Sequence, residues 1–460
     1  MRSAGKNMTA GNPLRLILAL SLPLMVANAF QQLYTVADTA IVGSFLGLNA
    51  LAALGAVDWF NWMMLSIVQG LAQGFSVRMA RQFGAGDHAA LRRTIGNACT
   101  LSLICAVALT ACAQGLTPFV LRVLQTPEEI MGMSLAYIRI IFWGLPVVLA
   151  FNLFSAMLRA VGDGKTPLVA MMIACAVNIG LDLLFVSPLG MGVEGAAIAT
   201  VIAQACSALI CLRMLLRTGL LRLEREDMRP DGKLCLNLLA LGIPVAAQNM
   251  IISVGGMIVQ RVVNSFDVVF VAGYTAANKL YGVLEIAATS FGYAMTVYVG
   301  QNLGVGDYGR IRKGVRAGAV AGVITSLLIC AAMLLFGRGI LSGFITSQNP
   351  LEAERALSYA VQFLRAMSVC LPVLYILHIV RSSLQGLGDT LFPMFSGLAE
   401  LAMRVGAALF LPAVMGYEAV FWGEVLAWAG ADVILLLSYR AHSRRFPVAG
   451  RGQALPAEEI

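Results

Sequence analysis

Two acidic residues inside apolar stretches are the first candidates for chemistry in this chain. Asp38 lies in the apolar stretch Ser21–Phe45, and Asp182 lies in a second apolar stretch, four residues after Asn178. Moving a charged side chain to the centre of a bilayer costs at least ~2.5 kcal/mol, so acids at such positions usually serve a function. A spacing of four residues places Asn178 and Asp182 on one face of a helix.

Four polar side chains are expected at one depth in the membrane. At about 1.5 Å per helical residue, Asp182 on an outward-running helix comes level with Thr200 on the next, inward-running helix, and Asp38 falls at a similar depth. Two carboxyl groups, an amide and a hydroxyl can share a proton or supply oxygen ligands to a small cation. The alternative is that these groups only hydrogen-bond to one another and hold three helices together.

The second half of the chain carries a different set of charges in its apolar stretches. Its candidate residues are Glu285, His378, Glu400 and Arg404. Glu400 and Arg404 are one helical turn apart, so we expect a salt bridge that neutralises both charges. Lys279, Arg404 and Glu424 lie at comparable depth, so either cation could instead pair with Glu424 across helices. His378 could relay protons, or it could be a hydrogen-bonded polar group without that function.

The remaining motifs favour structural roles. Gly-x-Gly-Asp occurs at Gly84–Asp87 and again at Gly304–Asp307. It lacks the Lys and Ser/Thr with which a phosphate loop holds nucleotide phosphates and Mg²⁺, so we interpret both copies as turns at helix ends. The sequence contains no HExxH or GxSxG motif, and its nine cysteines show no CxxC spacing, so nothing indicates a hydrolase or a zinc site.

Composition predicts a membrane protein. Of 460 residues, 59% are hydrophobic and only 12% are charged, whereas soluble domains carry about 25% charged residues. Apolar runs of about 20 residues, long enough to cross the ~30 Å hydrocarbon core, recur along the chain. We expect an all-α polytopic membrane protein with twelve transmembrane helices, at residues 13–45, 48–82, 92–115, 130–159, 167–187, 193–217, 235–265, 271–303, 312–337, 353–384, 391–413 and 417–440.

The basic residues fall in alternate loops. The formal net charge is +8, and Lys and Arg collect before the first predicted helix, after the second, sixth and eighth, and in the tail. By the positive-inside rule these segments, and with them both termini, lie in the cytoplasm. We therefore predict a multi-pass protein of the cytoplasmic (inner) membrane of a prokaryote, with no nucleic acid as partner.

The chain contains an internal repeat. LALSLPLMVA at Leu18–Ala27 is similar to LALGIPVAAQ at Leu239–Gln248, and LRAVGDGKTP at Leu158–Pro167 is similar to LQGLGDTLFP at Leu384–Pro393. We expect two pseudo-symmetric six-helix lobes, which are parallel repeats because each begins on the cytoplasmic side. The predicted domains are an N-terminal lobe at 1–217, a basic cytoplasmic connecting loop at 218–234, a C-terminal lobe at 235–440 and a cytoplasmic tail at 441–460.

In their order and duplication these segments resemble the multidrug and toxic compound extrusion (MATE) family of secondary transporters. The resemblance covers nearly the whole chain. It rests on the stretch with Pro23, Tyr34 and Asp38, on LRAVGDGKTP leading to Asn178 and Asp182, on GVEGAAIAT and on VGQNLGVGD. It implies two six-helix lobes that open alternately to either side of the membrane and export organic, often cationic, compounds in exchange for H⁺ or Na⁺.

The same resemblance implies an ion-coupling site in the first lobe. One branch of the family has an Asp on helix 1, Asn and Asp on helix 5 and Thr on helix 6, and the matching residues here are Asp38, Asn178, Asp182 and Thr200. Tyr34 and Asn152 match two further family positions. Another branch uses acids on helices 7 and 10, but here helix 7 has no acid, and the core of helix 10 has His378 but no Asp or Glu.

We predict a cation-coupled antiporter that exports organic, cationic or amphipathic, compounds by alternating access, and no enzymatic activity. Pro23 is the predicted point at which the first helix bends when the ion binds. The ion is H⁺ or Na⁺, since oxygen ligands suit both, and no other cofactor is expected. The expected partners are a small-molecule organic substrate and membrane lipid, and the expected state is a monomer.

Two other functions remain open from the sequence. A lipid-linked oligosaccharide flippase of the related fold superfamily should have a strongly cationic central cavity and often extra helices, whereas intramembrane Lys and Arg are few here. An intramembrane enzyme would use Asp38 and Asp182 as metal ligands or as acid and base. Prenyl-transfer sites of that kind need acid-rich DDxxD-like loops, and the sequence contains none.

Overall fold

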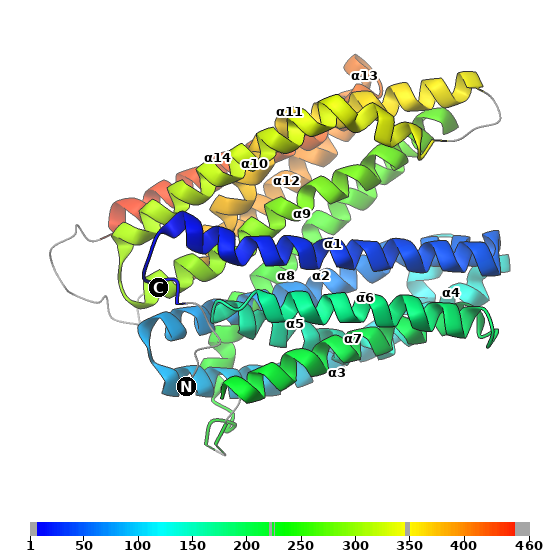
Figure 1. The fold of residues 1–460 in the computed structure, drawn as a ribbon. Coiled ribbons are helices and arrows are strands. Elements are labelled where there is room, and N and C mark those ends of the chain that lie inside the picture. Colours follow the sequence, from blue (N-terminus) through cyan, green and yellow to red (C-terminus); the bar gives the residue numbers. More distant parts are fainter. Residues whose placement is uncertain (1–6, 220–222, 225, 346–349, 447–460) are drawn as a thin grey trace. The chain divides into compact units, whose positions relative to one another are not determined.

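The computed structural model describes residues 7–219, 223–224, 226–345 and 350–446, and within these ranges it contains helices and no strands (Figure 1). The helices are α1 (Pro13–Leu46), α2 (Leu48–Ala85), α3 (His88–Val123), α4 (Glu128–Trp143), α5 (Leu145–Ala160), α6 (Lys165–Val186), α7 (Gly192–Thr218), α8 (Gly232–Val263), α9 (Val268–Gly304), α10 (Tyr308–Ser342), α11 (Pro350–Gly386), α12 (Leu391–Phe410), α13 (Pro412–Met415) and α14 (Glu418–Arg445). The prediction of an all-α fold is confirmed.

The helices have the length and composition of membrane spans. Among the described residues, ten helices could each cross a bilayer, and the bent pair α4 and α5 makes an eleventh span. The twelfth segment is α12, which carries Glu400 and Arg404 in its middle. A helix satisfies its own backbone hydrogen bonds, which lipid cannot do, and large apolar side chains such as Leu103 and Leu335 are 65% and 76% exposed on the outside.

Both Gly-x-Gly-Asp motifs are turns that end one helix and start the next, as predicted. Gly86 and Gly306 adopt φ values of 73° and 71°, a left-handed conformation that glycine tolerates best. The aspartates that follow cap the next helices: Asp87 Oδ1 accepts from the N–H of Ala90 at 2.9 Å, and Asp307 Oδ1 accepts from the N–H of Arg310 at 2.9 Å. The two halves of the repeat thus share this local structure.

Several predicted helix bounds need correction. Residues 130–159 form two helices, α4 and α5, that meet at Gly144 with a bend of 44°. Pro146, at the start of α5, lacks the backbone N–H that would continue the ladder. The helix predicted at 391–413 ends at Phe410 for the same reason, because Pro412 begins the short α13. The helix predicted at 92–115 is longer at both ends, as the bounds of α3 show.

The chain divides into two compact units. One takes in Leu22–Ala246 and the residues before Gly11, and the other takes in Gly11–Ser21 and the residues from Ala247 onwards. The predicted lobe boundaries at 217 and 235 stay a prediction. The predicted loop 218–234 lies partly outside the described residues, at 220–222 and 225, as does most of the predicted tail, at 447–460.

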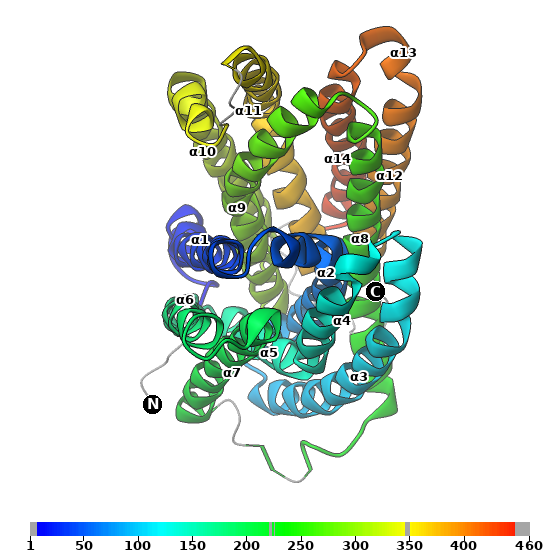
Figure 2. The same cartoon turned by 90° about the vertical axis from the view of Figure 1, so that its right-hand side faces the viewer.

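Within each unit, neighbouring helices lie side by side. In the first unit α6 and α7 run next to each other, with α5 close to α7 (Figure 1). In the second unit α12 packs along α14, and α9 packs along α11 (Figure 2). The pairs α6–α7, α9–α11 and α12–α14, together with α1, carry most of the charged and polar side chains discussed below.

Candidate functional site

A polar layer lies between two apolar cores of the first unit. One core contains Ala27 of α1, Met171 of α6 and Ala208 of α7. The other contains Val42 of α1, Val186 of α6 and Ala197 of α7. Along each helix, the residues between these apolar contacts are the predicted site residues: Tyr34 and Asp38 on α1, Asn178 and Asp182 on α6, and Thr200 on α7.

The two acids of this layer are buried. Asp38 is 7% exposed, and both Asn178 and Asp182 are fully buried. The carboxyl groups of Asp38 and Asp182 lie close enough to share a hydrogen bond. Neither acid forms an ion pair with a Lys, Arg or His among the described residues. These two acids, which the sequence analysis expects at one depth, thus lie next to each other.

Two hydrogen bonds join the other polar residues of the layer. Asn178 Nδ2 donates to Thr200 Oγ1 at 3.5 Å, and Gln204 Nε2 donates to the hydroxyl oxygen of Tyr34 at 3.1 Å. The first bond links α6 to α7, and the second links α7 to α1. Gln204 is 8% exposed and follows Thr200 by one helical turn, so the same spacing argument could have found it.

The layer has more acceptors than donors. No described residue donates to Oδ1 of Asp38, to either carboxyl oxygen of Asp182, to Oδ1 of Asn178 or to Oε1 of Gln204. A buried acceptor without a donor costs about 1–3 kcal/mol, and more when it is charged. Two carboxylates in hydrogen-bond contact also repel each other unless a proton or a cation lies between them. The layer therefore offers oxygen acceptors that a bound proton or small cation would satisfy.

A cation here would rely on carboxylate, amide and hydroxyl oxygens. Among the described residues, no three His, Cys, Asp or Glu side chains cluster as metal ligands. A Na⁺ ion would therefore need the oxygens of Asn178 and Thr200 in addition to those of Asp38 and Asp182, and such hard oxygen ligands suit it. A proton would need only the two carboxyl groups.

Asn152 and Pro23 do not belong to the polar layer. Asn152, on α5, is partly buried and donates from Nδ2 to the backbone oxygen of Val148 at 2.9 Å, which is a local contact within its own helix. No hydrogen bond among the described residues joins it to the layer. Pro23 lies inside α1, next to the point where the two compact units divide that helix between Ser21 and Leu22.

The charged residues of the second unit form cross-helix pairs. Glu285 of α9 contacts His378 of α11, with 3.5 Å between Oε1 and Nε2. Glu400 pairs with Arg381 of α11, and Arg404 pairs with Glu424 of α14 at 2.7 Å. The predicted Glu400–Arg404 salt bridge is therefore wrong.

The Arg404–Glu424 pairing across helices is confirmed. Lys279 is exposed and forms no ion pair with a described residue. Packing between helices decides these pairs. α12 packs along α14, which in turn packs along α11, so each charge finds a buried partner on another helix.

Asp432 is a buried acid that the sequence reasoning missed. It lies in α14, is 8% exposed, and has no hydrogen-bond donor to Oδ1 among the described residues. Its charge interacts with those of Arg381 and Glu400. The sequence does indicate this residue, since Asp432 is an acid within an apolar stretch, as Asp38 is.

A family model matches both halves of the chain. The model described as MatE matches residues 23–184 and, a second time, residues 244–406, which together are well over half of the chain. The two matches agree with the internal repeat seen in the sequence.

Individual proteins are similar along most of their length. The "Probable multidrug resistance protein YpnP" of Bacillus subtilis is 28% identical over 433 residues, which are 94% of this chain and 96% of that protein. The "Probable multidrug resistance protein YoeA" of the same organism is 27% identical over 338 residues, 72% of this chain and 73% of that protein.

Solved structures share the fold. The outward-facing conformation of a multidrug resistance MATE family transporter has a TM-score of 0.90 to this chain and 23% sequence identity. The match covers 98% of this chain and 99% of that one. The twelve-helix fold predicted from the sequence is therefore confirmed.

Proposed function

Because this chain belongs to the MatE family of multidrug efflux transporters, we propose that it exports organic compounds in exchange for H⁺ or Na⁺, and that the Asp38–Asp182 pair is its ion-coupling site. The observation that carries this proposal is the polar layer of the first unit. Its two carboxyl groups lie close together and are buried. Among the described residues they have no cationic partner, and three of their four oxygens have no donor.

The Asp38–Asp182 pair suits the coupling of ion binding to a conformational change, because the two carboxyls can stay close only when an ion is bound. Two ionised carboxylates about 4 Å apart repel by about 4 kcal/mol at an effective dielectric constant of about 20. A proton or Na⁺ between Asp38 and Asp182 removes that repulsion and draws α1 and α6 together. When the ion leaves, the same repulsion favours their separation. The ion thus binds one arrangement of α1 more tightly than another, which is the condition for it to drive a conformational change.

Pro23 gives α1 a place at which to change shape. It cannot donate a hydrogen bond to the carbonyl of Ala19, so the helix is weaker there than elsewhere. In the proposed cycle, ion binding bends α1 near Pro23 and releases the substrate to the outside, and ion release restores the substrate-binding state. Alternating access of this kind yields export against a gradient only if ion and substrate favour different states.

The substrate class is proposed from the relatives, and the location from the charges of the loops. Relatives named as multidrug resistance proteins support export of varied organic compounds, and we propose cationic or amphipathic ones. The charge pattern of the loops supports the cytoplasmic membrane of a prokaryote with both termini inside. The bacterial source of these relatives agrees with that location.

The test is efflux of ethidium, a lipophilic cation, from proteoliposomes under an imposed pH gradient or an imposed Na⁺ gradient. We expect one gradient to drive efflux by the wild type, and Asp38→Asn and Asp182→Asn to abolish that response. Glu194→Gln removes an exposed acid from α7 in the same unit and serves as the matched control. Full gradient-driven efflux by Asp38→Asn would contradict the assignment of the pair.

A further inference from the structure

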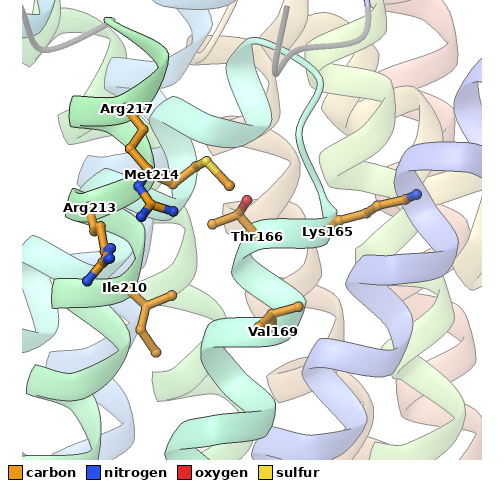
Figure 3. Close-up of a pocket in the computed structure, with 7 residues that line it drawn as sticks. All are labelled: Lys165, Thr166, Val169, Ile210, Arg213, Met214 and Arg217. Atoms are coloured by element: carbon orange, nitrogen blue, oxygen red, sulfur yellow. The ribbon is translucent and has the colours of Figure 1, made fainter. Parts of the chain in front are cut away.

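A basic pocket lies at one end of the α6–α7 pair, away from the carboxyl layer. It has a volume of about 290 Å³ and is lined by Lys165, Thr166 and Val169 from the start of α6 and by Ile210, Arg213, Met214 and Arg217 from the end of α7. Figure 3 shows the two arginines on the α7 side and Thr166 and Val169 facing them from α6, while the Lys165 side chain extends away from the arginines. All seven residues belong to the first unit.

The pocket is positively charged and its cations are unpaired. Lys165, Arg213 and Arg217 are exposed, no acid lines the pocket, and none of the three forms an ion pair with a described residue. The carboxylate nearest in sequence is Asp163, which is already engaged. It accepts from the N–H groups of Lys165 and Thr166 at 3.0 and 3.1 Å and from the Thr166 hydroxyl at 2.6 Å. An external anion would therefore meet free guanidinium groups.

Below the cations, the same surface is apolar. Val169 is 49% exposed, and Ile210 and Met214 are half-buried at the pocket wall. Further from the helix ends the outer surface continues with Met172 and Ile173 of α6. At about 1.5 Å per residue, Ile210 lies about 10 Å deeper along α7 than Arg217. A charged rim above an exposed apolar strip has the polarity of a phospholipid at the edge of a bilayer.

The fold does not require these cations. The repeat pairs LRAVGDGKTP with LQGLGDTLFP, so Leu391 occupies the position of Lys165 in the second half. With the same spacing, the positions of Arg213 and Arg217 are occupied by Tyr439 and Ser443 of α14. One half of the repeat therefore has three basic residues where the other half has none.

We propose that this pocket binds an anionic phospholipid, with the lipid phosphate held by Arg213 and Arg217 and an acyl chain lying along Val169 and Ile210. Guanidinium groups bind phosphate through paired hydrogen bonds, which a lysine amine does not reproduce. Lys165 adds a third positive charge beside the headgroup. A choline or ethanolamine headgroup carries an ammonium that this pocket would repel, since no acid or aromatic ring lines it.

The test is native mass spectrometry of the delipidated full-length protein, titrated with phosphatidylglycerol or with phosphatidylcholine of the same acyl chains. We expect phosphatidylglycerol to bind at least about tenfold more tightly, because the basic residues of the pocket attract its net negative headgroup. The double variant R213Q/R217Q should lose that preference. The control K313Q/R316Q removes two exposed charges from α10 and should keep it.

Further variants and a competition assay separate lipid binding from binding of a soluble anion. R213K/R217K keeps the charge and should recover part of the preference, since the lysines retain attraction but lose the paired hydrogen bonds. If the double glutamine variant does not fold, the single variants R213Q and R217Q should each weaken binding of phosphatidylglycerol. Equal binding of both lipids to the wild type, or unchanged binding to the glutamine variants, would overturn the proposal. Competition by millimolar inorganic phosphate as effective as that by the lipid would assign the pocket to a soluble anion and would also overturn it.

Discussion

Asp38→Asn tests the polar layer most sharply, because it removes one charge of the buried pair and keeps the size of the side chain. The wild-type pair must offset a repulsion of about 4 kcal/mol with a proton or a cation. In the variant, the new amide can donate a hydrogen bond to Asp182, whose oxygens have no donor among the described residues of the wild type. We therefore expect the variant to fold equally well without the ion.

The assay is thermal unfolding of the purified protein between pH 5 and pH 9, with and without Na⁺. A proton that the folded state holds and the unfolded chain releases makes stability fall as the pH rises. If the ion is H⁺, the wild type should lose stability toward pH 9 and Asp38→Asn should lose much less.

If the ion is Na⁺, it should stabilise the wild type by about 2.7 kcal/mol at one hundred times its Kd, and should not stabilise the variant. Glu194→Gln should behave as the wild type. Identical responses of wild type and Asp38→Asn to both pH and Na⁺ would show that the pair binds neither ion.

Two further predictions concern the rest of the molecule. Glu424→Gln leaves the buried Arg404 without its partner and should lower the free energy of unfolding by about 3–5 kcal/mol in the same thermal assay. Glu354→Gln breaks the exposed Arg338–Glu354 pair of 2.6 Å and should change the free energy of unfolding by at most about 1 kcal/mol. Equal effects would show that burial does not set the contribution of these pairs. Pro23→Ala restores a backbone hydrogen bond to α1 and should stabilise the protein while it slows efflux from proteoliposomes; unchanged efflux would remove Pro23 from the mechanism.

The carboxyl layer could be predicted from the sequence because helix geometry fixes depth. A constant rise per residue places Asp38, Asp182 and Thr200 at one depth in the membrane. Long helices that cross the same apolar layer can shift little along the membrane normal. Asn178 follows from its spacing of one turn from Asp182. Asn152 could not be placed this way, because the helix that carries it is broken at Gly144 and the count of residues along a straight helix no longer gives its position.

The charge pairs of the second unit could not be predicted in the same way. Glu400 and Arg404 have the spacing of an ion pair within one helix, but buried partners on α11 and α14 satisfy both charges. Which faces of three helices meet depends on how they rotate about their axes, and spacing within one helix does not contain that information. Asp432 belongs to the same region, and only the packing of α14 against α11 brings it near Arg381.

The central claim is that the Asp38–Asp182 pair carries the ion that drives export. The most direct measurement is ion movement triggered by substrate, recorded in proteoliposomes with a pH-sensitive dye for H⁺ or with radioactive Na⁺ for Na⁺. Adding ethidium should move one of the two ions in the opposite direction through the wild type and the Glu194→Gln control. No such movement should occur through Asp38→Asn or Asp182→Asn. Substrate-triggered ion movement that persists in both variants would show that the pair does not carry the ion.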